Sequence, residues 1–135
     1  MEPTSQPTRQ GMKVLFIEDE HFISELYARA LTKAGYDVTA IVDGEEGLKA
    51  AQSDAYDIIL LDIMVPNLTG TEILGRLRGS DAKPIKAKII IATNLEQGEE
   101  GRAAVEQKAD GYIVKAEITP RQLVELLNQL DLKQA

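Results

Sequence analysis

Six polar residues of this sequence stand at or directly after the ends of four apolar runs. Four of the six are carboxylates, and the other two carry a hydroxyl and an ammonium group. The set is Glu18, Asp19, Glu20, Asp62, Thr93 and Lys115. Asp62 is the most informative member, because aspartate is depleted from strands and is costly to bury without a partner. It nevertheless interrupts the run DIILLDI (57–63), and such a placement indicates a functional site.

Brought together, these residue types could support phosphoryl chemistry. Converging carboxylates repel one another unless a cation lies among them. A small set of oxygen ligands suits Mg²⁺, which keeps several water molecules and is completed by a phosphate group. A threonine hydroxyl and a lysine ammonium supply the donors that phosphoryl oxygens need, and a carboxylate can act as the nucleophile. The combination predicts a site able to carry an aspartyl phosphate.

Taken one at a time, the same residues have simpler roles. The acidic triplet 18–20 could cap the helix that follows it. Thr93 could be an ordinary β-former at a strand end, and Lys115 could be a solvated surface residue. The combination at four strand ends is much more specific than any single member.

Short β-branched or aliphatic runs alternate along the chain with segments of helical spacing. The five runs are KVLFI (13–17), DVTAIV (37–42), DIILLDI (57–63), AKIIIAT (87–93) and GYIVK (111–115). Apolar spacing predicts helices at 23–34, from Asp43 to about Ser53, at 71–77, at 99–108 and at 119–130. Thr119 followed by Pro120 is a typical N-cap and first-turn pair.

Five strands alternating with five helices predict an α/β fold, a doubly wound five-stranded parallel sheet flanked by five helices. The continuously apolar segments IILL (58–61) and IIIA (89–92) are typical of strands that are buried on both faces. The carboxyl ends of parallel strands share one edge, where such folds build their ligand sites. The six polar residues are therefore expected to gather there. The sequence alone leaves the strand order open between two common arrangements.

Composition narrows the function classes. The chain has 135 residues, of which 44% are hydrophobic and 27% charged, as in a soluble domain with a sizeable core. A formal net charge of −7 argues against direct nucleic-acid binding. The absence of cysteine excludes disulfides and thiol chemistry. No apolar run approaches the roughly 20 residues of a membrane span, so we expect a cytoplasmic protein without membrane insertion.

The amino-terminal residues differ from the rest of the chain. The stretch MEPTSQPTRQG is polar and aperiodic and contains two prolines. It predicts a disordered tail over residues 1–11. One domain is expected over residues 12–132.

Over roughly residues 12–132 the sequence resembles the receiver domains of bacterial two-component response regulators, including the single-domain chemotaxis type. The resemblance rests on Glu18, Asp19, Asp62, Thr93 and Lys115, on Pro66 and Gly70 at the family's usual distances after Asp62, and on Tyr112 three residues before Lys115. It implies a flavodoxin-like sheet with the strand order 2-1-3-4-5, which is carried over from the family.

The resemblance also implies roles for the acidic residues. Asp62 corresponds to the phosphoacceptor. Asp19 would bind Mg²⁺ directly and Glu18 through a water molecule, with the backbone carbonyl of Met64 as a further metal ligand.

The remaining roles concern the response to phosphorylation. Thr93 and Lys115 would contact the phosphoryl oxygens, and Tyr112 would be the aromatic switch residue, although core packing explains Tyr112 equally well. Charge on Asp62 would draw Thr93 inward and bias the face formed by the fourth helix, fifth strand and fifth helix.

Two positions depart from the family pattern. Ala116 follows Lys115 where receivers usually carry a proline, often after a cis bond. A cis bond before alanine would cost about 2.5–4 kcal/mol, so we expect a trans bond and a different loop. Asn94 follows Thr93 where the family usually has a small residue.

The rate of hydrolysis is a further expectation. In the family, the side chains at positions 64 and 95 flank the approach of the hydrolytic water, and here they are the apolar Met64 and Leu95. The bulk of Asn94 narrows the same entrance. Because excluded water suppresses hydrolysis, the sequence predicts slow self-dephosphorylation.

The sequence thus predicts a phosphorylation-activated signalling switch of a two-component phosphorelay. It is not expected to be an enzyme, apart from catalysing its own Mg²⁺-dependent phosphorylation and dephosphorylation. The expected partners are a sensor histidine kinase or phosphotransfer protein and a downstream effector protein. No effector domain follows Ala135, so output would pass through a partner, unless the chain is a fragment of a longer regulator.

Three other classes fit less well. A haloacid-dehalogenase-type phosphohydrolase needs a second aspartate two residues after the nucleophile, where this chain has Met64. A flavin or nucleotide module needs a Gly-rich or Ser/Thr-rich loop after the first strand, and EDEHF (18–22) is its electrostatic opposite. An unphosphorylated receiver-like interaction module stays open as the alternative, because Ala116 and Asn94 depart from the family pattern.

Overall fold

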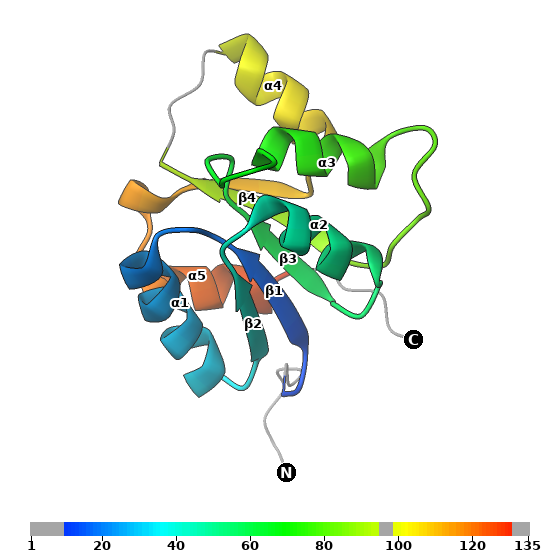
Figure 1. The fold of residues 1–135 in the computed structure, drawn as a ribbon. Coiled ribbons are helices and arrows are strands. Elements are labelled where there is room, and N and C mark those ends of the chain that lie inside the picture. The colour runs from blue at the N-terminus through cyan, green and yellow to red at the C-terminus, as the bar shows by residue number, and fades with distance from the viewer. Residues whose placement is uncertain (1–9, 95–98, 131–135) are drawn as a thin grey trace.

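The computed structural model describes residues 10–94 and 99–130, and it has the predicted α/β architecture (Figure 1). The strands are β1 (Lys13–Ile17), β2 (Asp37–Ile41), β3 (Ile58–Leu61), β4 (Lys88–Thr93) and β5 (Gly111–Val114). The helices are α1 (His21–Lys33), α2 (Gly44–Gln52), α3 (Gly70–Arg78), α4 (Glu99–Lys108) and α5 (Pro120–Asn128), with a short 3₁₀ turn at Lys115–Glu117. Residues 1–9 of the expected tail, Leu95 and residues 131–132 lie outside the described residues.

The five strands form one parallel sheet in the order β2-β1-β3-β4-β5, which confirms the order carried over from the family. In the register, Val14 of β1 lies opposite Ile58 of β3, and Ile58 lies opposite Lys88 of β4. The central strand β3 is buried along its whole length, whereas the edge strand β2 is largely exposed. The apolar run IILL is therefore continuous because both of its faces are covered.

Helices cover both faces of the sheet (Figure 1). One apolar cluster lies on the side of α1 and α5, and the other lies on the side of α2, α3 and α4. Alternate residues of each strand point into opposite clusters, as the period of a strand requires. Phe16 of β1 packs toward α1 and α5, whereas Leu15 and Ile17 pack toward α2 and α3. None of the described helices has the length and apolar character of a membrane span.

The helix ends follow local sequence signals. Thr119 and Gln122 form a reciprocal capping box at the start of α5, with the N–H of Gln122 donating to the Thr119 hydroxyl at 3.1 Å and Pro120 in the first turn. Asp43 caps α2 by accepting from the N–H of Glu46 at 2.9 Å. Gly35 follows α1 with φ +104°, a conformation that favours glycine. The predicted helix starts and stops are confirmed to within a few residues.

Three strands end earlier than the sequence predicts, and β2 does so by one residue, at Ile41. β3 ends at Leu61, so Asp62 is the first residue beyond the strand. Its N–H still donates to the Ile17 carbonyl at 3.0 Å, but its side chain turns to accept from the N–H of Met64 at 3.1 Å. β5 likewise ends at Val114, because the 3₁₀ turn begins at the next residue.

The start of α3 lies directly against the end of β3. A Cβ atom at Gly70 would overlap the carbonyl oxygen of Asp62. Only glycine permits this approach, which explains the spacing between Asp62 and Gly70 in the sequence.

Candidate functional site

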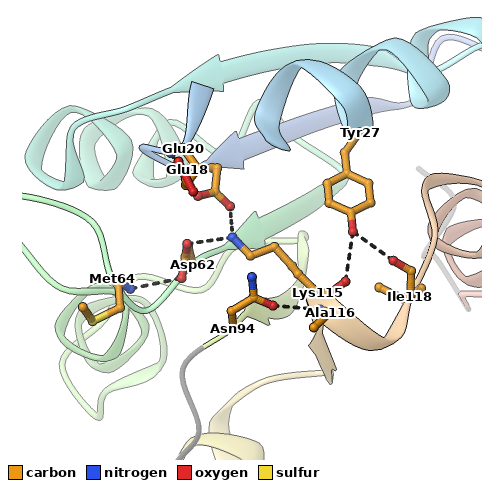
Figure 2. A network of polar contacts seen from close by, with 9 residues as sticks. All are labelled: Glu18, Glu20, Tyr27, Asp62, Met64, Asn94, Lys115, Ala116 and Ile118. Carbon is orange, nitrogen blue, oxygen red and sulfur yellow. Dashed lines mark hydrogen bonds and ion pairs between the residues drawn. The ribbon is translucent and has the colours of Figure 1, made fainter. Parts of the chain in front are cut away.

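Three side chains from the carboxyl ends of three strands meet in a buried ion cluster (Figure 2). Glu18 follows β1, Asp62 follows β3 and Lys115 follows β5. The Lys115 Nζ lies 2.9 Å from Asp62 Oδ2 and forms a shorter contact with Glu18 Oε1. The side chains of Glu18, Lys115 and Asp62 are 0%, 4% and 6% exposed. The predicted convergence of these residues at one edge of the sheet is therefore present in the fold.

Backbone N–H groups hold the remaining carboxylate oxygens. Asp62 Oδ1 accepts from the N–H of Met64 at 3.1 Å, and Glu18 Oε2 accepts from the N–H of Glu20 at 3.1 Å. Each carboxylate thus binds the ammonium through one oxygen and its own following loop through the other. These bonds fix the orientation of both carboxylates within the cluster.

Burial changes the protonation equilibria of the cluster. The pKa of Glu18 is raised to about 7, chiefly by burial and also by the neighbouring Asp62, against the lowering effect of the Lys115 ammonium. Burial by itself would lower the pKa of Lys115, but the hydrogen bonds and charges of Glu18 and Asp62 outweigh it and leave this pKa raised. Lys115 is therefore a fixed positive charge beside Asp62.

A third carboxylate completes an acidic group that could hold a metal ion. Glu18, Asp19 and Asp62 each place one carboxylate oxygen within 4.8 Å of the others. Asp19 is exposed, whereas Glu18 and Asp62 are buried. Three carboxylates and one ammonium leave a formal charge of −2 when all are ionised. An all-oxygen set with excess negative charge suits a hard divalent cation.

Two side chains hold the turn that carries Lys115, and the sequence did not predict this role for either of them. The Tyr27 hydroxyl of α1 lies 3.3 Å from the Lys115 carbonyl and 3.0 Å from the Ile118 carbonyl. Asn94 Oδ1 accepts from the N–H of Ala116 at 2.7 Å. Tyr27 lies within the helix predicted at 23–34, and the signal that could have identified its second role is a hydroxyl on a ring that the helix buries.

The remaining residues around the cluster vary in exposure. Thr93 is the last residue of β4 and is fully buried. Met64 is 60% exposed, and its side chain points away from the ion cluster in Figure 2. Leu95, which the family resemblance implies also flanks the approach of the hydrolytic water, lies outside the described residues. The expected trans bond before Ala116 is present, since the described residues contain no cis peptide.

Tyr112 lies outside the ion cluster, on the face formed by α4, β5 and α5. The guanidinium of Arg102 lies over its ring, 4.4 Å from the centroid. Burial raises the pKa of the Tyr112 hydroxyl above its usual value. Both residues line a hollow of about 420 Å³ whose other walls come from β5, the turn after it and α5. The ring is neither fully buried nor free, which is compatible with both of the roles considered for it.

The sequence model of the family described as the response regulator receiver domain matches residues 14–128. Among curated proteins, the chain is 37% identical over 118 residues to the response regulator ArlR of Staphylococcus saprophyticus, a match that covers 87% of this chain and 50% of that protein. The chain therefore spans about half the length of the curated relatives it matches.

Solved structures of receiver domains have the same fold. The receiver domain of the Francisella response regulator 1452 superposes with a TM-score of 0.75 at 28% identity, covering 87% of this chain and 94% of that one. The chemotaxis protein CheY4 of Vibrio cholerae superposes with a TM-score of 0.73 at 30% identity, covering 90% and 99%.

Proposed function

Since this chain belongs to the response regulator receiver family, we propose that it is a phosphorylation-activated switch of a two-component phosphorelay and that Asp62 is its phosphoacceptor. One observation carries the proposal. The Asp62 carboxylate is nearly buried at the carboxyl edge of the sheet, 2.9 Å from the Lys115 ammonium. A carboxylate nucleophile held beside a fixed cation is the arrangement that an acyl phosphate requires.

The transfer step uses groups of both proteins. An oxygen of Asp62 attacks the phosphorus of a phosphohistidine on a sensor histidine kinase or phosphotransfer protein. The O–P bond forms as the N–P bond breaks, and the leaving imidazole takes the electron pair of that bond and a proton from the solvent. Lys115 and the hydroxyl of Thr93 stabilise the charge on the phosphoryl oxygens. Since these donors belong to the receiver, it catalyses its own phosphorylation and dephosphorylation, and we assign it no other reaction.

The acidic group would hold Mg²⁺ during this step. Asp19 and Asp62 would bind it directly, Glu18 through water, and the Met64 carbonyl as a further ligand. When bound, Mg²⁺ neutralises charge on the transferring phosphoryl group. The fit is supported by three carboxylate oxygens within 4.8 Å of one another and by their excess negative charge.

The donor protein would dock beside the acidic mouth, in the cytoplasm. Phe22 is 73% exposed in the first turn of α1, and Met64 is 60% exposed directly after Asp62. Together they offer exposed apolar area shortly after the carboxyl ends of β1 and β3. The exposed carboxylates of Asp19 and Glu20 would slow the approach of small anionic donors such as acetyl phosphate without preventing it, so a protein that can bury Phe22 and Met64 has the advantage.

The output face would be the surface of α4, β5 and α5, where Tyr112 acts as the switch residue and a downstream effector protein binds. The domain that carries both faces would span residues 12–132, after the tail over residues 1–11. Because the chain spans about half the length of the curated relatives it matches, the partner that reads the switch would be a separate protein or a further domain.

The phosphorylated state would be long-lived. The exposed Met64 cannot orient water by hydrogen bonding. The amide oxygen of Asn94 is engaged with the N–H of Ala116, which leaves it less able to hold a hydrolytic water. Leu95 would add a second apolar group at the entrance.

Binding of beryllofluoride, a phosphoryl mimic, tests the proposal. It should shift the NMR signals of the wild type only when Mg²⁺ is present. Asp19→Ala should abolish this response while the fold stays intact. Glu20→Gln should retain it, because Glu20 is a neighbouring exposed carboxylate outside the acidic trio. Wild-type protein that fails to respond would instead favour an unphosphorylated interaction module.

A further inference from the structure

The residue that places an ammonium in the site also begins a turn. Lys115 is the first residue of the 3₁₀ turn Lys115–Glu117, so its side chain enters the ion cluster while its backbone changes direction. Within the turn itself, the N–H of Ile118 donates to the Lys115 carbonyl at 3.3 Å. A long lysine side chain has many rotamers, and its Nζ position therefore depends on how firmly this backbone is held.

Two side chains from opposite sides hold the turn (Figure 2). Tyr27 approaches from α1, and its hydroxyl bridges the carbonyls of Lys115 and Ile118 at 3.3 and 3.0 Å. Asn94 approaches from the end of β4 and accepts from the N–H of Ala116 at 2.7 Å. Three backbone groups within four residues are thus bonded to side chains that belong to other elements.

The Tyr27 anchor is rigid. Its side chain is 7% exposed, and its ring packs against Phe16 with the centroids 6.3 Å apart. The core therefore fixes the hydroxyl, and the hydroxyl fixes the turn. Asn94 directly follows Thr93, so the second anchor joins the turn to the strand end that carries the other proposed phosphoryl donor.

We infer that Tyr27 and Asn94 are positioning residues, which set the Lys115 ammonium for the phosphoryl group by clamping the turn that follows β5. This inference rests on the proposed role of Lys115 at Asp62. It extends that role, because a donor must lie within about an ångström of its productive place to stabilise developing charge. Neither side chain contacts the phosphoryl group in this assignment, and both act through the Lys115 backbone.

The most specific test of the first anchor is Tyr27→Phe, because this variant removes the hydroxyl and keeps the ring in the core. Its matched control is Tyr36→Phe. The Tyr36 side chain lies in the same core, and its hydroxyl donates to Asn128 Oδ1 of α5 at 2.7 Å, away from the turn. Both changes remove a tyrosine hydroxyl that hydrogen-bonds to a distant segment of the chain. Asn94→Ala tests the second anchor at an exposed position, where folding is not at risk.

The measurement is the affinity of each variant for beryllofluoride in Mg²⁺ buffer, followed by NMR. Tyr27→Phe and Asn94→Ala should each weaken binding by about three- to ten-fold, the range expected for one lost hydrogen bond. Tyr36→Phe should match the wild type. Unchanged affinity in both anchor variants, or an equal loss in the Tyr36 control, would overturn the inference.

A double-mutant cycle with Lys115 distinguishes a role of Tyr27 in positioning the ammonium from a general weakening of the site. In a Lys115→Ala background, Tyr27→Phe should cause no further loss of affinity, because the group it positions has been removed. A full, additive loss in that background would show that Tyr27 does not act through Lys115. Failure of the wild type to bind beryllofluoride would overturn the proposed function as well, whereas normal wild-type binding with unaffected anchor variants would overturn only this inference.

Discussion

The two ends of the same strands use carboxylates for different purposes. At the amino edge of the sheet, Asp57 precedes β3 and Asp110 precedes β5. Asp57 accepts from the N–H of Lys13 at 2.8 Å, and Asp110 accepts from the N–H of Ile89 at 2.7 Å. Each carboxylate therefore satisfies a backbone donor near the beginning of a neighbouring strand, which is a structural role.

The cations at the amino edge are on the surface. Lys86 lies 3.8 Å from Asp57, and Arg78 lies 3.1 Å from Asp110. The side chains of the two aspartates are 24% and 31% exposed, so water screens these pairs. An additional ligand is not needed to balance their charge.

The carboxyl edge differs in burial and in charge balance. Asp62 follows β3 and Lys115 follows β5, and with Glu18 they form a cluster from which water is nearly excluded. With Asp19, carboxylates outnumber the ammonium by two. A carboxylate at a strand end therefore does not by itself mark a functional site. The shared burial of several unbalanced charges distinguishes the functional edge from the structural one.

The largest expected difference between the edges is in phosphorylation. Asp62→Asn keeps the shape of the side chain and removes the nucleophile, so incubation with acetyl phosphate and Mg²⁺ should add no mass. Asp57→Asn, at the other end of β3, should gain one phosphoryl group as the wild type does. Intact-protein mass spectrometry measures both. Phosphorylation of the Asp62 variant at the wild-type rate would assign the acceptor elsewhere.

The second difference is in stability. Lys115→Ala leaves the buried carboxylates of Glu18 and Asp62 without their cation, and it should lower the free energy of unfolding by about 3 kcal/mol. Lys86→Ala removes an exposed partner of Asp57 and should cost less than about 1 kcal/mol. Urea titrations in metal-free buffer compare the two. Equal losses would show that burial does not separate the edges.

The smallest expected effect is on the lifetime of the phosphorylated state. Met64→Asn and Leu95→Glu would replace the two apolar side chains that the family resemblance implies flank the hydrolytic water with polar ones that could recruit it. The decay of phosphorylated protein in Mg²⁺ buffer should be slow in the wild type and faster in the double variant. A wild-type lifetime of seconds, or no acceleration, would show that these side chains do not control hydrolysis.

Much of the fold could be predicted because its signals are local. The buried run 58–61 and the cap formed by Thr119 and Pro120 each act within one element, and each is found where the sequence places it. The convergence of Glu18, Asp62 and Lys115 was also predictable, because parallel strands bring their carboxyl ends to one edge. The strand order was not, and it came from the family resemblance.

What the sequence by itself determined is the type of element at each position and which polar residues stand at strand ends, because propensity and periodicity depend on near neighbours in the chain. Only the tertiary structure decided which of those residues share a buried environment. Asp57 and Asp62 flank the same short strand, yet one is screened by water and the other lies beside Lys115, 53 residues away in the chain. The contacts of Tyr27 and Asn94 with the turn after β5 also depend on the tertiary structure, because these residues lie close to the turn only once the sheet and α1 have packed.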